Sequence, residues 1–360
     1  MHDVNVISSS IVRRSQSKVF LYRPSAACLL PVAPIGVRVS LRAITGSLAR
    51  GIKIQSVPQL ANRNLAVFRE QAFVPELPAL LRTDGLSDQL PAMRSWFHPM
   101  IAEDRSYKIL KHEYLSQFGD SMVNLEVTHH DLNNRQTTFE QLNAPFSFFL
   151  NWTEAQCKTM PIATSSDHSS ASRQQQQQQQ KENRSIYLAQ HQLSSLPQAL
   201  QSDLPTPDLV LHAGKGDIYD SNIWIGTAPT YTPLHRDPNP NYFLQLSGTK
   251  IVRLFPPRIG NEIFHGVQCE IGATDSAIFR GHEMMQGKER RVLEEVVWGP
   301  PRQYRKVHDK EQQAPAPPGL DQCWQAIVEQ GTALFIPRGW WHSIRGIGRG
   351  VIASVNWWFR

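Results

Sequence analysis

One stretch limits the fold of this chain more than any other: YTPLHRDPNPNYFLQLSGTKIVRLFPP at residues 231–257, a polar motif followed by two runs of strand-forming residues. The runs cover residues 241–246 and 249–255, and Ser247-Gly248 between them is typical of a two-residue hairpin loop. The sequence therefore predicts a β-ribbon here, with the polar motif directly before it.

Four polar side chains of this stretch are expected on one face of the ribbon. His235 and Asp237 are two residues apart, so an extended backbone directs both to the same side. In the predicted hairpin Asn241 and Lys250 also share a face, and parity carries that face back toward the motif. An imidazole, a carboxylate, an amide and an ammonium are an unusual set for a core face, so the pattern indicates a functional site.

His-x-Asp supplies two members of the facial set of two histidines and one carboxylate, which binds Fe(II) and leaves three coordination positions open. The best candidate for the second histidine is His342, which follows two tryptophans. Before it, residues 332–336 are expected to form a strand and residues 337–339 a turn. Most of the 13 histidines are expected to be surface or structural groups, so the surrounding pattern carries this prediction.

The final strand, VIASVNWWFR, alternates between two faces. We expect Ser354, Asn356 and Trp358 on one face and Val355 and Trp357 on the other.

Lys250 is informative because of its charge. Fe²⁺, one aspartate, a dianionic 2-oxo-diacid and one lysine sum to zero. A cofactor that chelates iron through its 2-oxo-acid end still carries a remote carboxylate, which is costly to bury without a cation. The alternative is a solvated strand residue beside a turn, but the face shared with Asn241, Asp237 and His235 favours a neutralised pocket.

The segment from His235 to Lys250 resembles the JmjC-domain 2-oxoglutarate oxygenases. That family has His-x-Asp, an Asn six residues after the first His and a Lys fifteen residues after it; this chain matches with His235, Asp237, Asn241 and Lys250. Thr232 matches the hydroxyl three residues before the first ligand. The resemblance implies Fe(II) held by His235, Asp237 and His342, 2-oxoglutarate as cosubstrate, and O2 as oxidant.

Three further segments resemble the arginyl-hydroxylase branch of that family, also named lysine-specific demethylase eight: residues 187–193, 221–226 and 68–78. The resemblance extends from about residue 57 to the C-terminus. It implies that Trp224 lines the pocket and that the cosubstrate site includes Tyr187, Thr232, Asn241, Lys250, Asn356 and Trp358, the last two as support. The chain departs from the branch at Asn356, where the branch has a small hydroxyl residue and asparaginyl-hydroxylase relatives have asparagine.

The expected activity is hydroxylation of a side chain, arginyl by preference, in a protein or peptide substrate, with release of succinate and CO2. Histone lysine demethylation is the second enzymatic interpretation, and a tRNA-base hydroxylase is a third. A non-catalytic cupin-like scaffold is the rival from another class, and a metal hydrolase or isomerase of the cupin class would not depend on 2-oxoglutarate. The oligomeric state is left open.

The formal net charge of +6 comes from the N-terminal part. Residues 1–69 contain ten Lys or Arg and one acidic residue, whereas residues 70–360 contain 27 basic and 30 acidic residues. The near-neutral body lacks the basic stripe that nucleic-acid binding needs. An Arg- and Ser-rich leader with few acids is typical of a mitochondrial transit peptide. The alternatives are a disordered basic extension and a cytoplasmic or nuclear protein.

Four regions are expected. Residues 1–56 form the basic leader, and residues 57–158 a helical and β lead-in that packs on the barrel. Residues 159–184 are a low-complexity insertion with seven consecutive glutamines. Residues 185–360, which open with helix spacing and a possible strand, form a mainly β domain with a disordered insertion at about 283–320. Short strands with Gly and Pro turns predict a double-sheet barrel of the cupin type (jelly roll, double-stranded β-helix).

Cysteine spacing and hydropathy argue against three other classes of protein: zinc-binding, disulfide-rich and helical membrane proteins. Cys28, Cys157, Cys269 and Cys323 are far apart without a CxxC pair, so neither a zinc site nor a disulfide framework is indicated. No stretch approaches the roughly 18 to 20 apolar residues that a membrane-spanning helix needs.

Overall fold

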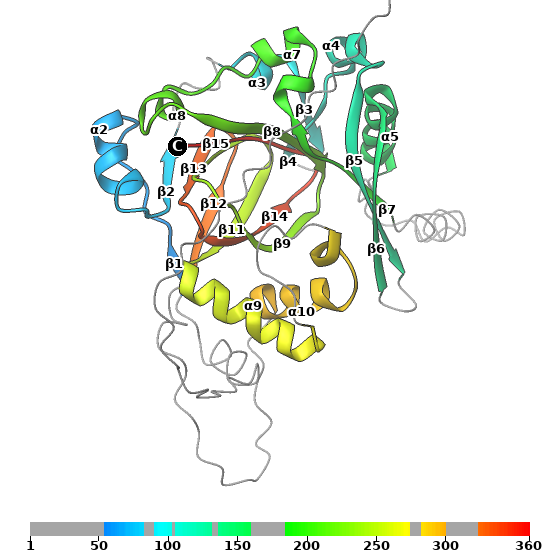
Figure 1. The fold of residues 1–360 in the computed structure, drawn as a ribbon. Helices are drawn as coiled ribbons and strands as arrows, with labels where there is room; N and C mark the ends of the chain where they lie inside the picture. The colour runs from blue at the N-terminus through cyan, green and yellow to red at the C-terminus, as the bar shows by residue number, and fades with distance from the viewer. Residues whose placement is uncertain are drawn as a thin grey trace, which may run out of the picture. The chain divides into compact units, whose positions relative to one another are not determined.

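The structure of the protein is a computed structural model that describes residues 54–82, 90–102, 105–131, 136–159, 184–273, 282–299 and 323–360. Two β-sheets facing each other form its centre (Figure 1). This mostly antiparallel arrangement confirms the predicted double-sheet barrel.

The smaller of the two barrel sheets has five strands. Their order is β1 (Ile54–Ser56), β12 (Cys323–Val328), β11 (Thr249–Phe255), β14 (Trp341–Ile347) and β9 (Thr230–Arg236). Only the β1–β12 pair in this sheet is parallel.

The larger sheet has eight strands, in the order β2 (Ala79–Arg82), β13 (Thr332–Ile336), β10 (Asn241–Ser247), β15 (Val351–Phe359), β8 (Ile218–Thr227), β7 (Arg184–Gln192), β5 (Met122–Asp131) and β6 (Gln136–Pro145). A separate ribbon pairs β3 (Phe97–Ala102) with β4 (Arg105–Leu110). The lead-in therefore contributes helices, three strands of the larger sheet (β2, β5 and β6) and the separate ribbon.

Alternation in the central strands separates the barrel interior from the outer core. In β15, Val355 and Trp357 belong to the outer core, while Asn356 and Trp358 line an interior cavity. This confirms the predicted faces of the final strand. The predicted strand at residues 332–336 is also confirmed, as β13.

The predicted hairpin across Ser247-Gly248 is wrong. β10 pairs with β13 and β15, whereas β11 pairs with β12 and β14, so the two strands lie in different sheets. The chain turns a corner at Gly248, where φ is +70°. Every residue of β10 is buried, and a two-stranded ribbon could not cover both of its faces. Asn241 and Lys250 nevertheless line one cavity because the two sheets face each other.

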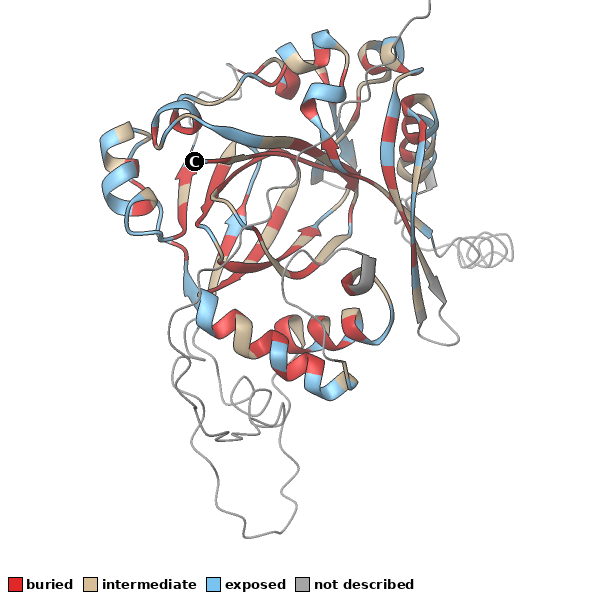
Figure 2. Cartoon of the chain, viewed as in Figure 1, coloured by how far each residue is buried: buried red, intermediate tan, exposed pale blue. Residues whose placement is uncertain are grey.

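Helices cover the outer faces of both sheets. A core cluster unites the larger sheet with α2 (Leu65–Phe68), α3 (Pro91–Ser95), α4 (His112–Leu115), α5 (Phe146–Thr159), α7 (Gln198–Ser202) and α8 (Asp208–His212). A second cluster joins the smaller sheet to α9 (Pro257–Ile271) and α10 (Gly287–Trp298). Figure 2 shows the buried faces of these two helices turned toward each other and the sheet. No described helix has the length and apolar content for crossing a bilayer.

Two predicted boundaries need correction, and the structure decides one assignment that the sequence left open. Residues 54–56, placed in the leader, form β1 through pairing with distant residues 323–325. In the segment that starts near residue 185 the possible strand is confirmed as β7, because pairing with β5 and β8 overrides the helix spacing. The insertion predicted at about 283–320 begins with ordered residues, the 3-10 turn His282–Met285 and α10. The sequence prediction missed this helix because its many charged residues obscure the apolar face formed by Val292, Leu293, Val296 and Val297.

The remaining segments named from the sequence lie outside the described residues. They are residues 1–53 of the leader, 160–183 of the glutamine-rich insertion and 300–322 of the second insertion.

Candidate metal and cosubstrate site

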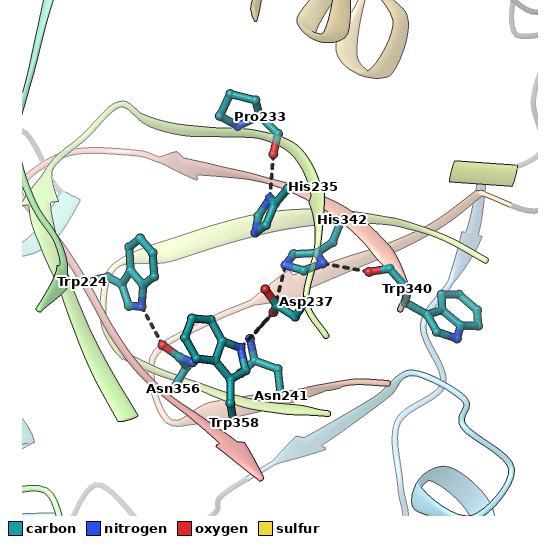
Figure 3. A network of polar contacts seen from close by, with 9 residues as sticks. All are labelled: Trp224, Pro233, His235, Asp237, Asn241, Trp340, His342, Asn356 and Trp358. Carbon is teal, nitrogen blue, oxygen red and sulfur yellow. Dashed lines mark hydrogen bonds and ion pairs between the residues drawn. The ribbon is translucent and has the colours of Figure 1, made fainter. Parts of the chain in front are cut away.

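The polar motif and the distant histidine meet on adjacent strands. β9 carries His235, Asp237 follows its end, and β14 carries His342. His235 and His342 lie opposite each other in the β9–β14 pairing. One ligand atom from each of the three side chains lies within 4.8 Å of the others (Figure 3). The structure thus brings together the three side chains that the sequence selected.

Backbone carbonyls fix both imidazoles. His235 Nδ1 lies 2.9 Å from the carbonyl oxygen of Pro233, and His342 Nδ1 lies 3.1 Å from that of Trp340. Because a carbonyl only accepts hydrogen bonds, each Nδ1 carries the proton. Each Nε2 therefore keeps a free lone pair, as a metal ligand requires.

Two donors orient the carboxylate of Asp237. Its Oδ2 accepts hydrogen bonds from Asn241 Nδ2 at 2.9 Å and Trp358 Nε1 at 3.0 Å, and lies 3.6 Å from His342 Nε2. Burial and the neighbouring His235 lower the pKa of His342 to about 4, outweighing the opposite effect of Asp237. A buried carboxylate beside two imidazoles whose Nε2 atoms face it is a donor set that fits a divalent iron ion.

Lys250 is buried in the same cavity and is 2 % exposed. Its Nζ donates hydrogen bonds to Ser354 Oγ at 2.7 Å and Tyr187 Oη at 3.2 Å. Burial lowers the pKa of Lys250 to about 7. In the described part of the chain no carboxylate forms an ion pair with this amine. An anionic ligand in this cavity would therefore pair with the desolvated amine of Lys250 and favour its charged form.

The cavity has a volume of about 340 Å³ and contains every side chain that the sequence proposed for the site. Those residues are Tyr187, Trp224, Thr232, His235, Asp237, Asn241, Lys250, His342, Asn356 and Trp358.

Two amides in the cavity wall have polar atoms available for a ligand. Trp224 Nε1 donates to Asn356 Oδ1 at 2.7 Å, which leaves Asn356 Nδ2 buried without a partner among the described residues. Asn241 Nδ2 donates its hydrogen bond to Asp237. Asn241 Oδ1 is buried and has no partner among the described residues. Buried polar atoms are rarely left unsatisfied, so both positions fit a polar cosubstrate.

Sequence reasoning placed Ser354 on the correct strand face without giving it a role, although it makes the shorter hydrogen bond to Lys250. It missed Glu126, Gln141 and Gln190, which also line the cavity. Glu126 and Gln141 belong to β5 and β6, and only sheet pairing brings these strands to the site. No local signal could have identified Glu126 and Gln141.

Glu126 places a carboxyl group in the wall of the cavity, opposite Tyr187 in the β5–β7 pairing. Desolvation raises the pKa of Glu126 to about 7, against the opposing effect of its hydrogen bond with Gln141. The cavity thus offers a third chemical feature, a carboxyl group that ionises near neutral pH.

Comparison with known proteins agrees with this geometry. The model of the cupin-like domain family matches residues 85–360. The chain belongs to the cupin-like domain family. This cupin-like domain is 23 % identical to lysine-specific demethylase 8 of Xenopus tropicalis over 304 residues, which are 84 % of this chain and 53 % of that protein.

Two further relatives carry different names. The cupin-like domain is 27 % identical over 175 residues to lysine-specific demethylase JMJ30 of Arabidopsis thaliana, covering 48 % of this chain and 33 % of that protein. It is 28 % identical over 192 residues to the human bifunctional peptidase and (3S)-lysyl hydroxylase JMJD7, covering 49 % and 54 %. The chain therefore spans about a third to a half of the length of these relatives.

Proposed function

We propose that this cupin-like domain is an Fe(II)- and 2-oxoglutarate-dependent dioxygenase that hydroxylates a protein side chain. The observation that carries the proposal is the presence, in one cavity, of a His-Asp-His cluster and a buried lysine that has no carboxylate partner among the described residues. The first feature fits iron, and the second fits the remote carboxylate of 2-oxoglutarate.

Each residue has a distinct task in this proposal. His235, Asp237 and His342 would hold Fe(II), which with 2-oxoglutarate and O2 supplies the oxidation of a C–H bond and yields succinate and CO2. Asn241 and Trp358 orient the carboxylate of Asp237. Such supporting hydrogen bonds typically affect affinity or activity by about 10- to 100-fold.

Lys250, with Tyr187 and Ser354 bound to its amine, would hold the remote carboxylate of the cosubstrate. Thr232 and the free atoms of Asn241 and Asn356 provide further polar contacts in the same cavity. Apolar side chains of the wall, such as Phe243 and Ile344, exclude water around these groups.

A cationic target residue suits the cavity best, and an arginyl side chain is the favoured one. Glu126 supplies a carboxyl group, and Trp224 an aromatic surface on which a guanidinium can stack. Lysine demethylation is the second candidate, because several relatives are named lysine-specific demethylases and an N-methyl lysine is also a cation.

Succinate release tests the proposal. The wild-type protein with Fe(II), 2-oxoglutarate and pools of arginyl, lysyl and methyl-lysyl peptides should form succinate, and Asp237→Ala should reduce this to background. A +16 mass shift on arginyl peptides supports hydroxylation, whereas formaldehyde with methyl-lysyl peptides supports demethylation. Equal succinate from the wild type and Asp237→Ala would refute the enzyme.

A thermal shift separates the enzyme from the scaffold alternative. Mn(II) together with N-oxalylglycine should raise the Tm of the wild type and of a remote surface variant such as Arg258→Gln, and leave Asp237→Ala unchanged. A non-catalytic scaffold shows no shift with any of the three proteins.

A further inference from the structure

A second cavity, of about 650 Å³, borders the candidate site. The two cavities share Glu126, Tyr187 and Met285 as lining residues. The second cavity differs in charge: β14 and α10 line it with Arg345, Arg290 and Arg291. The function proposed above assigns no role to these three guanidinium groups.

The guanidinium groups that line this cavity outnumber its carboxylates. The guanidinium groups of Arg290 and Arg345 both lie near the ring of Tyr231, 5.2 Å and 5.6 Å from its centroid. Glu294 is the acidic residue among them, and its carboxylate is bound to Arg345 at 2.7 Å. Glu126 lies at the shared wall and is only partly ionised near pH 7. One full carboxylate therefore faces three guanidinium groups.

Arg290 retains a donor for a ligand. Its Nε is buried and has no hydrogen-bond partner among the described residues. Burial also lowers the pKa of Arg290, with Glu294 opposing that effect. A partly buried guanidinium with an unsatisfied donor gains most from a carboxylate, which accepts charge-assisted hydrogen bonds.

The start of α10 adds further donors. Gly287, its first residue, lines the cavity, and the preceding Gln286 makes no side-chain capping bond to the helix. The helix is 12 residues long, so the first amides and the helix dipole favour an anion here.

Strand geometry gives the separation from the metal ligands. Tyr231 precedes His235 by four residues on β9, and Arg345 follows His342 by three residues on β14. At about 3.3 Å per residue these separations are roughly 10 to 13 Å. An extended peptide whose target residue enters the candidate site covers that distance in three to four residues.

We propose that the cavity lined by Arg290, Arg291 and Arg345 binds the side-chain carboxylate of an Asp or Glu that lies three to four residues from the target residue in the protein substrate. This inference rests on the proposed function. A peptide is the expected source of the carboxylate because the cavity shares three lining residues with the site in which the target residue would be oxidised.

Paired peptides test this specificity. Thirteen-residue peptide pools with a central arginine carry one Glu, or one Gln as the matched control, at each position from six residues before to six after the target. Turnover is measured as succinate release and as the +16 mass shift. We expect Glu three or four residues from the target, either before it or after it, to raise kcat/KM by about tenfold or more. This increase should come from a lower KM.

Variants of Arg290 identify the group responsible. Arg290→Gln should remove the preference for Glu, Arg290→Lys should keep part of it, and Arg290→Glu should reverse it in favour of Lys at the same position. Arg258→Gln, an exposed change of the same type on α9, should leave the preference intact. The Tm of each variant shows that it is folded.

Binding without turnover separates this inference from the proposed function. Fluorescein-labelled Glu and Gln peptides are titrated into wild type and Arg290→Gln without metal or cosubstrate, and anisotropy is recorded. Tighter binding of Glu peptides to the wild type alone supports the basic cavity even if no pool is oxidised. Equal affinities for Glu and Gln, or a preference that Arg290→Gln retains, overturns it. Succinate at background in every pool counts against the oxygenase alone.

Discussion

The state of Lys250 depends on what occupies the cavity. In solution a lysine ionises near pH 10.4, but burial lowers the pKa of Lys250 to about 7. Among the described residues, its amine donates hydrogen bonds only to hydroxyl oxygens, those of Ser354 and Tyr187. A bound carboxylate would reverse this effect, because a neighbouring negative charge favours the ammonium form.

This position gives a pH-dependent prediction. Between pH 7 and 9, Lys250 is protonated in the unfolded chain but has released its proton in the folded protein without metal and cosubstrate. The contribution of Lys250 to the free energy of unfolding therefore rises with pH, by at most about 1.4 kcal/mol per pH unit. Lys250→Met should lose that contribution and raise the KM for 2-oxoglutarate about a hundredfold. Urea unfolding at pH 7 and 9 measures the first effect, and parallel curves for the two proteins contradict it.

Glu126 gives folding stability the opposite dependence on pH. Its pKa is raised to about 7, so it stabilises the fold most below the pKa of an unfolded glutamate, and this contribution is lost as the pH rises through 7. A cationic substrate needs the ionised form, so the KM for an arginyl peptide should fall between pH 6 and 8. Glu126→Gln should raise KM about tenfold and abolish this difference. An unchanged pH profile of KM in the variant excludes the role in substrate binding.

At the scale of elements, the corner between β10 and β11 decides how the site is assembled. The positive φ of Gly248 lets the chain pass from one sheet to the other, and Lys250 follows two residues later. A Cβ at Gly248 would lie 2.5 Å from Ile352 Cδ1 and 3.0 Å from the carbonyl oxygen of Val351. The turn is therefore restricted both by conformation and by space.

A pair of glycine variants separates these two restrictions. Gly272, at the end of α9, has a similar φ of +73°, but a Cβ there would meet nothing within 4 Å. Gly272→Ala should cost about 1 kcal/mol of unfolding free energy from conformation alone. Gly248→Ala should cost about 2–4 kcal/mol, because overpacking adds to the same term. Equal midpoints in urea would show that Ile352 adjusts without cost.

At the scale of the whole molecule, charge separates the N-terminal segment from the body. The first 69 residues carry ten of the chain's 37 basic residues and one of its 31 acidic residues. We propose that this segment directs mitochondrial import. The sequence pattern supports the proposal, and residues 1–53 lie outside the described part of the structure.

Imaging tests the import proposal. A fusion of the full chain to a C-terminal fluorescent protein should coincide with a mitochondrial marker, and a fusion that lacks residues 1–50 should not. A variant with the Arg and Lys residues of this segment changed to Gln should behave like the truncation. Diffuse or nuclear fluorescence from the full-chain fusion would reject import.

The sequence predicted the double-sheet fold and the shared side of His235 and Asp237 because both depend on local spacing. His235 and Asp237 share a side through strand parity, and alternation in the last strand separated Asn356 and Trp358 from Trp357. The hairpin between β10 and β11 was wrong because local turn residues do not reveal which strands pair. The helix α10 was missed because charged residues surround its apolar stripe.

The amino-acid sequence alone determined which polar groups are available and on which side of each strand they lie, since these follow from residue type and a two-residue repeat. Tertiary structure alone decided that Lys250 would have no carboxylate partner among the described residues, that Glu126 would line the same cavity, and that three arginines would gather beside it. The reason is that strand partners are chosen by burying both faces of a sheet across large separations in the chain.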